Sequence, residues 1–350
     1  MIKPLSPLVI PVFIAHQGCP HRCVFCNQHP ITGNSEQATA LCSVEAIKAE
    51  IRRWLDRSPR RGRRVQVAFY GGSFTGLPRD RQRQLLSVVQ PFMASGQVDG
   101  IRLSTRPDYI TPDTPAFLRD LGVDTVELGV QSMDQQVLDQ SRRGHSVGQV
   151  AAAMAILQKG GICTGAQLML GLPGETTLSA VSGARELAGL QPDFARLYPT
   201  LVIGGSGLEA LYRQGLYRPL SLPRAIALAA RLTGILGRRG IRVVRTGLQP
   251  SAELEASLVA GPYHPAFGEL VKARGFFKEV RRQLSRYQGR PCRLIVAAQD
   301  RSLFNGQKKC SLERLKSLHL LEQTTITFSD LPGERGVVRV EGLDQPIALT

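Results

Sequence analysis

Apolar, β-branched runs alternate with helical patterns along the first 250 residues, and this alternation restricts the possible folds more than any other feature. Seven runs have the length of strands: 8–15, 65–70, 100–105, 125–130, 163–170, 194–200 and 241–247. Segments with helical spacing lie between them, such as 149–161 and 43–55, where Ser43 is the expected N-cap. Six or seven strand–helix repeats predict a parallel sheet covered by helices. The repeat number favours a barrel or an open partial barrel, with the functional site at the carboxyl ends of the strands.

The pattern changes near residue 261, after a stretch rich in proline and glycine. Apolar residues then recur at spacings of three and four from Leu270 to Tyr287, which predicts one amphipathic helix with a basic outer face. Three further strand-like runs surround a helix near 311–321. We therefore expect an α/β protein with a partial (β/α)6-type barrel over 1–260 and a small basic α+β appendage over 261–350.

The chain is strongly basic. Its 350 residues carry 44 Lys+Arg against 28 Asp+Glu, a formal net charge of +16, and the stretch 52–64 alone holds seven arginines and one aspartate. A basic surface of this kind attracts polyanions, so tRNA or another RNA is an expected partner. The alternative is a set of solvated arginines without a nucleic-acid ligand.

Nothing in the sequence indicates a membrane protein or a disulfide-stabilised one. The first apolar run, 8–15, contains Pro11 and is too short to cross a bilayer, and the N-terminus shows no signal pattern. Seven cysteines in 350 residues are too few for a disulfide scaffold. We expect a cytoplasmic, reducing setting, where clustered cysteines more often bind metal.

Three cysteines, Cys19, Cys23 and Cys26, follow the first predicted strand as C-x3-C-x2-C. A structural zinc site needs four ligands, commonly from two C-x2-C pairs, and the second pair is missing here. Histidines 16, 21 and 29 could supply a fourth ligand, so zinc remains an alternative. A four-iron cluster held by three thiolates would leave one iron open to bind a substrate or cofactor.

Five further motifs are "YGGSFTG" (70–76), "LSTRPDY" (103–109), "VELGVQS" (126–132), "QSRRGH" (140–145) and "LMLGLPGE" (168–175), and all but "QSRRGH" run over the end of a predicted strand into the loop after it. With the cysteine triad, they resemble the radical S-adenosylmethionine (SAM) superfamily. The resemblance covers roughly residues 8–247. It is nearest to the catalytic subunit of the elongator complex, a radical SAM tRNA acetyltransferase, and extends to oxygen-independent coproporphyrinogen III oxidase and its relatives.

The resemblance implies an enzyme with two cofactors. Cys19, Cys23 and Cys26 would hold a 4Fe-4S cluster, and SAM would bind the fourth iron. Reductive cleavage of SAM would then give methionine and a 5′-deoxyadenosyl radical that abstracts a hydrogen atom. The electron would come from an external donor of the flavodoxin or ferredoxin type, and no further catalytic residue is identified.

The same resemblance assigns SAM contacts residue by residue. The carbonyls of Gly71 and Gly72 would hold the SAM amino group, with Ser73 standing where many members carry an acidic residue. Arg143 would pair with the SAM carboxylate, because its planar fork suits two oxygens. Gln131 matches a second polar contact.

Four assignments are less direct. Ser104 and Gln167 stand where related enzymes carry acidic SAM ligands. Phe25 would lie beside the adenine, or else be an ordinary packed aromatic. Glu127 lies on a predicted barrel strand, where an interior charge is costly unless it is paired or used. We favour a SAM or active-site role for Glu127, the alternative being an ion pair with a nearby arginine.

The sequence departs from the elongator-type pattern beyond the barrel. Residues 261–350 show no glycine-rich acetyl-CoA loop, and no extra cysteines are positioned to close a zinc site. The leading interpretation is therefore a radical SAM enzyme that modifies tRNA or another RNA. Two alternatives stay open: a radical SAM enzyme with a small, tetrapyrrole-like substrate, and a basic RNA-binding protein with a structural metal site.

Overall fold

The computed structural model describes most of the chain. The described residues are 7–14, 18–19, 23–27, 43–58, 62–286, 291–329, 337–341 and 347–348. Several residues of the sequence analysis lie outside these ranges: His16, His21, His29, Arg60, Arg61 and Tyr287.

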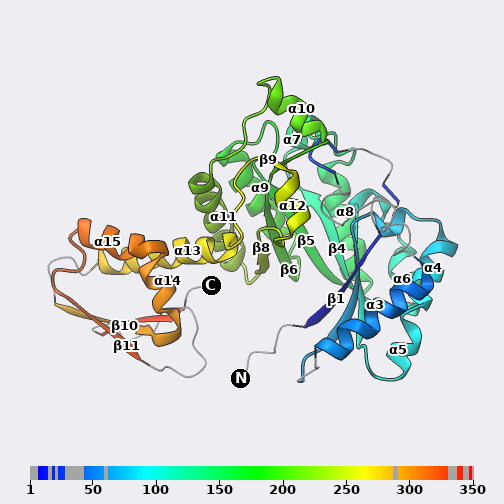
Figure 1. The fold of residues 1–350 in the computed structure, drawn as a ribbon, viewed down its shortest axis with the longest axis horizontal. Coiled ribbons are helices and arrows are strands. Elements are labelled where there is room, and N and C mark those ends of the chain that lie inside the picture. The colour runs from blue at the N-terminus through cyan, green and yellow to red at the C-terminus, as the bar shows by residue number, and fades with distance from the viewer. Residues whose placement is uncertain are drawn as a thin grey trace.

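Seven strands form one parallel sheet and follow each other in chain order across it. They are β1 (Leu8–Phe13), β2 (Val65–Tyr70), β3 (Gly100–Thr105), β4 (Val123–Gln131), β5 (Cys163–Leu170), β6 (Phe194–Pro199) and β8 (Arg242–Thr246). Every neighbouring pair is parallel. The sheet curls without closing (Figure 1), which confirms the predicted α/β partial barrel.

Helices connect successive strands and cover the outer face of the sheet (Figure 1). They are α3 (Val44–Arg57), α4 (Arg79–Ser87), α5 (Gln90–Ala94), α6 (Thr114–Asp120), α7 (Gln135–Gln140), α8 (Val147–Lys159), α9 (Thr177–Gly189) and α11 (Leu222–Gly237). The predicted N-cap of α3 is confirmed, since the Ser43 side chain accepts a hydrogen bond from the Ala46 backbone. A capping box of Ser146 and Gln149 starts α8.

Alternation along the strands separates the core from the concave face. Phe69, Leu103 and Leu128 are fully buried in the hydrophobic core shared with the helices. Their neighbours Tyr70 and Ser104 are only partly buried. Because successive side chains of a strand point to opposite faces, these polar neighbours lie on the concave side of the sheet.

The sequence analysis missed a small substructure near the carboxyl edge of the sheet. It comprises the two-stranded sheet of β7 (Val202–Ile203) and β9 (Leu258–Ala260), with α10 (Gly207–Arg213) and α12 (Ala252–Ser257). Strands of two and three residues are too short to show a period in the sequence. This substructure matters because it contacts the cysteine loop.

The appendage forms a second core that is joined to the barrel by one helix. It contains α13 (Phe267–Leu284), β10 (Cys292–Ala297), α14 (Arg301–Asn305), α15 (Cys310–Ser317), β11 (Thr324–Ser329), β12 (Val337–Glu341) and β13 (Ile347–Ala348). The sheet order is β11-β10-β12-β13. Helix α13 contributes Phe267 and Val271 to the barrel core, and Phe276 and Val280 to the appendage core.

The predicted boundary at residue 261 remains a prediction, since α13 belongs to both cores. Among the described residues, no helix combines the length and the apolarity needed to span a membrane.

Candidate functional site

The three cysteines lie on the loop that leaves the carboxyl end of β1. Cys23 is buried, and Cys19 and Cys26 are partly buried. No three His, Cys, Asp or Glu side chains among the described residues are placed to hold one metal ion. A four-iron cluster does not require such convergence, because its thiolates bind different irons. Three thiols on one loop are a donor set that fits a four-iron cluster.

Backbone and side-chain hydrogen bonds fix the cysteine loop from two sides. The Val24 N–H donates to the Ser141 carbonyl (3.1 Å), which follows α7. The Val24 carbonyl accepts from the Leu208 N–H in α10 (2.6 Å), and Asn27 Nδ2 donates to the Gly204 carbonyl (2.6 Å). The loop is thus held between α7 and the β7–α10 segment.

The loop after β2 packs directly against the cysteine loop, at two glycines. A Cβ atom on Gly18, which has φ +72°, would lie 2.1 Å from the Ser73 carbonyl oxygen. A Cβ atom on Gly76 would lie 2.3 Å from the Gly18 carbonyl oxygen. Gly71 also adopts a positive φ of 89°. Only glycines allow this approach, so the "GGSFTG" loop and the cysteine loop form one rim.

Ser73 has a structural task in that rim. Its side chain is fully buried, lies 3.1 Å from the Thr105 hydroxyl and accepts a hydrogen bond from the Arg106 N–H (3.3 Å). These contacts join the loop after β2 to the loop after β3. The predicted contacts of Gly71 and Gly72 with SAM remain predictions.

Arg143 reaches the cysteine loop from the segment after α7. Its Nη1 donates to Cys23 Sγ (3.4 Å) and its Nη2 to the Gly129 carbonyl (2.9 Å). Its Nε is buried and finds no hydrogen-bond partner in the part of the chain that the structure describes. The Arg143 carbonyl accepts from Arg106 Nη1 (2.7 Å), and Arg106 is held by a two-pronged ion pair with Asp108. The guanidinium is therefore fixed beside a sulfur atom.

The electrostatics of the rim act in opposite directions on the Cys19 thiol. Burial raises the pKa of Cys19, and the nearby Cys23 raises it further. The positive charges of Arg143 and Arg106, and a hydrogen bond from the Ser73 backbone, lower it. The surroundings thus offer partners to a thiolate, the form that binds iron, while burial keeps the metal-free thiol protonated.

A second cluster occupies the middle of the concave face, around Glu127 of β4. The Glu127 carboxylate is fully buried and accepts from Tyr70 OH (2.8 Å), Arg102 Nη1 (3.0 Å), Arg196 Nη2 (2.8 Å) and Gln167 Nε2 (3.0 Å). Arg196 Nε also lies 2.7 Å from Glu127 Oε2. The ion pairs that were the alternative for Glu127 are present, and its SAM contact stays a prediction.

This central cluster carries more positive than negative charge. Arg102 and Arg196 share one carboxylate, and their side chains are only 10% and 13% exposed. Burial raises the pKa of Tyr70, and the negative charge of Glu127 raises it further, so the phenol stays protonated. Five neighbouring strands, β2 to β6, contribute to the cluster, which ties the middle of the sheet together.

The remaining predicted contacts occupy different places. Ser104 and Gln167 lie on the concave face, partly buried. Phe25 is partly buried and packs against the cluster that joins Val24 to Leu208 of α10. Gln131 ends β4 at φ 66°, an uncommon conformation for a residue other than glycine, next to a shift in strand register.

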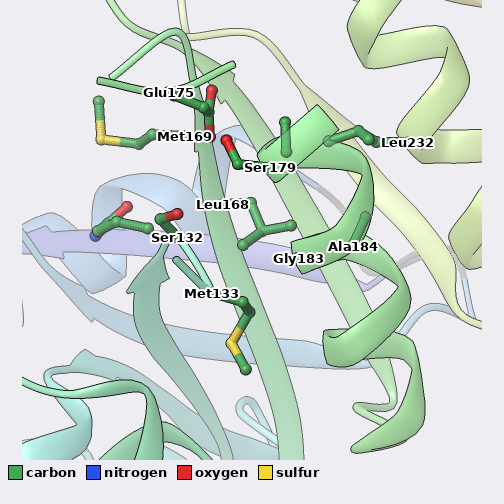
Figure 2. A pocket seen from close by; sticks show the side chains of 11 residues that line it. Ser132, Met133, Leu168, Met169, Glu175, Ser179, Gly183, Ala184 and Leu232 are labelled. Atoms are coloured by element: carbon green, nitrogen blue, oxygen red, sulfur yellow. The ribbon is translucent and has the colours of Figure 1, made fainter. Parts of the chain in front are cut away.

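A small cavity lies between the ends of β4 and β5 and helix α9 (Figure 2). It is lined by Gln131, Ser132, Met133, Leu168, Met169, Glu175, Ser179, Ala180, Gly183, Ala184 and Leu232. At about 10 Å³ it has room for one water, which excludes it as the binding site of a nucleoside cofactor. Burial raises the pKa of Glu175 on its wall to about 7.

The structure thus joins the cysteines, the "GGSFTG" loop and Arg143 into one rim, and Glu127 with Gln167 into one central cluster. Sequence reasoning missed Gly18, Arg106 and Arg196. Arg106 lies inside the "LSTRPDY" motif, so the sequence could have pointed to it. The roles of Gly18 and Arg196 follow only from the tertiary structure, because Gly18 packs against the loop after β2 and Arg196 of β6 contacts Glu127 of β4.

Two family models match the chain. The model of the radical SAM superfamily matches residues 13–178, and the model of the radical SAM C-terminal domain matches residues 192–276. The two matches cover most of the barrel from Phe13 onward, the β7–α10 substructure and the first part of α13. The appendage beyond residue 276 lies outside both.

Individual proteins extend the comparison. An uncharacterized protein of Methanocaldococcus jannaschii is 30% identical over 231 residues, which are 63% of this chain and 69% of that protein. A tRNA uridine(34) acetyltransferase of Dehalococcoides mccartyi is 29% identical over 230 residues, 57% of this chain and 50% of its own length. The chain therefore spans half of that enzyme.

A solved structure shows the same fold. The archaeal Methanocaldococcus infernus Elp3 with an N-terminal deletion superposes with a TM-score of 0.61 and 21% sequence identity. The match covers 80% of this chain and 64% of that one. At this identity, the likeness concerns the fold alone.

Proposed function

Because the chain belongs to the radical SAM superfamily, we propose that Cys19, Cys23 and Cys26 hold a 4Fe-4S cluster whose remaining iron binds SAM. When bound and reduced, that pair supplies a 5′-deoxyadenosyl radical. One observation carries the proposal: a three-thiol loop is fixed at the carboxyl end of β1 by two neighbouring segments, with a guanidinium against one sulfur.

The chain's own residues would orient SAM on this rim. The carbonyls of Gly71 and Gly72 would accept hydrogen bonds from its amino group, and Arg143 would pair with its carboxylate. Gln131, Ser104 and Gln167 offer polar contacts, and Phe25 offers an aromatic edge to the adenine. Glu127 contributes by fixing Gln167, since the amide of Gln167 donates to its carboxylate.

We propose tRNA or another RNA as the substrate. Two facts support this: the net charge of +16 and the similarity to a tRNA uridine(34) acetyltransferase. Acetyl transfer is not part of the proposal, because the chain spans only half of that enzyme. The reducing electron would come from an external flavodoxin- or ferredoxin-type donor.

Iron analysis and product formation test the cluster. Anaerobically purified protein should contain about four irons per chain, as a cuboidal cluster requires. With dithionite and SAM it should form 5′-deoxyadenosine. Cys23→Ala should abolish that product, whereas Cys163→Ala, a partly buried cysteine on β5, should not. Stoichiometric zinc without iron after reconstitution would refute the proposal.

Mass spectrometry tests the substrate. RNA nucleosides and small metabolites are compared between cells that contain the protein, lack it, or carry Cys23→Ala. A modified nucleoside that disappears in the last two strains supports RNA. A change confined to a tetrapyrrole-like metabolite contradicts it.

A further inference from the structure

We propose that Arg143 is a fixed cationic N–H donor to the Cys23 thiolate, which raises the reduction potential of the cluster before SAM arrives. The inference rests on the proposed function, since it needs a cluster on the three thiols. It gives Arg143 a task beyond the SAM contact that the sequence predicts.

The contact itself is direct. Arg143 Nη1 donates to Cys23 Sγ at 3.4 Å, and the Arg143 residue is only 7% exposed. A guanidinium stays protonated at any working pH, so its charge is permanent. Among the described residues, no carboxylate forms an ion pair with Arg143; its partners are the sulfur and the Gly129 carbonyl.

The surrounding structure holds the guanidinium in place. Strand β4 has a glycine where the guanidinium passes: a Cβ atom on Gly129 would lie 2.7 Å from Arg143 Nη2. The Arg143 backbone is bonded at both ends, since its N–H donates to the Leu138 carbonyl (2.9 Å) and its carbonyl accepts from Arg106. The donor is therefore in position without help from a ligand.

Among the described residues of the rim, Arg143 is also the buried charge that has no carboxylate partner. The charge of Arg106 is neutralised by its ion pair with Asp108. The neighbouring His145 is neutral, because burial, and then the charges of Arg143 and Arg106, lower its pKa to about 3. One net positive charge thus lies against a cluster ligand in a poorly solvated place.

That charge should favour the reduced cluster. Reduction adds negative charge that is shared with the thiolates, and hydrogen bonds to the sulfurs are one of the factors that set cluster potentials. A buried cation at hydrogen-bond distance stabilises the more negative state more than the less negative one. Removing it should make the cluster harder to reduce.

The sulfur contact can be separated from a SAM contact. Both terminal nitrogens of Arg143 donate hydrogen bonds to the protein, and its Nε has no partner within the described ranges. A residue that served the SAM carboxylate alone would leave the cluster unchanged when SAM is absent. Measurements without SAM therefore report the sulfur contact.

The test is a potentiometric titration of the reconstituted full-length protein, followed by electron paramagnetic resonance, without SAM. Arg143→Gln should shift the cluster midpoint to a more negative potential. Gly129→Ala should shift it in the same direction by displacing the guanidinium. Arg142→Gln, which removes the same charge from the exposed neighbour, should stay near wild type.

Two controls complete the set. A methyl group on Gly129 would also lie 3.0 Å from the side chain of Gln131, so Gln131→Ala tests whether that side chain affects the cluster. It should leave the reduction potential measured without SAM unchanged. Arg143→Lys keeps the charge without the fork and should fall between wild type and Arg143→Gln.

Three results would contradict the inference or the proposed function on which it rests. An unchanged potential in Arg143→Gln with a full complement of iron, together with weaker SAM binding, overturns the inference and leaves Arg143 as a SAM contact. If Arg143→Gln retains no cluster, an unchanged potential in Gly129→Ala overturns it instead. Wild-type protein that assembles no cluster refutes the proposed function, and the inference falls with it.

Discussion

The concave face and the rim both bury arginines, but they balance the charge differently. In the central cluster, Arg102 and Arg196 meet the carboxylate of Glu127, so the chain supplies its own counter-charge. At the rim, Arg143 meets a sulfur and a backbone carbonyl. The first arrangement has a counter-charge within the chain, although two guanidiniums share it, whereas the second would receive one from the proposed cluster and SAM.

This difference separates stability from function. A buried ion pair is costly to break, because removing one partner leaves the other uncompensated in a poorly solvated place. A buried cation without a carboxylate already bears that cost and is retained where an anion is to be bound. Changes at the centre should therefore affect folding first, and changes at the rim should affect the cluster first.

The largest effect on stability is expected from Glu127→Gln. It leaves Arg102 and Arg196 without a counter-charge, so the free energy of unfolding should fall by about 3–5 kcal/mol. Urea denaturation measures it. Glu269→Gln, which breaks an exposed pair with Lys272, is the matched control and should cost about 0.5 kcal/mol or less. Equal losses in both variants would mean that the centre is solvated.

Glu175 is a partly buried carboxylate whose surroundings differ from those of Glu127. The charged group that acts on it is Asp134, whereas Glu127 is paired with arginines. Burial raises its pKa from 4.5 to about 7, so the folded chain holds a proton that the unfolded chain releases. Stability should therefore fall by about 3 kcal/mol as the pH rises from about 4.5 to 7, and then level off. Urea denaturation across this range should show the fall in wild type.

Glu175→Gln removes the titrating group. The difference between wild type and variant therefore gives the contribution of Glu175 to the pH dependence of the free energy of unfolding, separate from that of other groups. A parallel pH dependence in both proteins would show that Glu175 is ionised in the folded state at pH 5.

Gly18→Ala tests how tightly the rim is packed. The methyl group would collide with the Ser73 carbonyl at a positive φ, so stability should fall by about 1–3 kcal/mol and iron content should drop. Gly62→Ala is the matched control, because Gly62 has nearly the same φ, +75°, and nothing within 4 Å of the added atom. Equal losses of stability in the two variants would show that backbone strain at a positive φ accounts for the effect, without a contact between the cysteine loop and the loop after β2.

The smallest effect concerns a third set of arginines, in the basic stretch 52–64 of the sequence. Replacing arginines 60, 61, 63 and 64 by glutamine should flatten the salt dependence of RNA binding, by about 0.7–0.9 in the log–log slope for each phosphate group that the variant no longer neutralises. Replacing Lys308, Lys309, Arg314 and Lys316 of the appendage is the control of equal charge. A slope that changes only in the control would place the RNA surface on the appendage.

Much of the fold followed from local patterns. All seven strands of the large sheet, the cap of α3 at Ser43 and the amphipathic helix of the appendage were predicted, because each leaves a period or a capping signal in a short window. The β7–α10 substructure was missed, since its strands are too short for any period. The motifs after the strands were correctly placed at the carboxyl edge of the sheet.

The partners of individual side chains were beyond the sequence. The Arg143–Cys23 contact joins residues 120 positions apart, and the Arg196–Glu127 contact joins residues 69 apart. The sequence by itself determined the strand–helix order, the three-cysteine loop and its family. Only the tertiary structure decided that one set of arginines faces a carboxylate and another faces a sulfur, because strand register and loop packing fix which distant side chains meet.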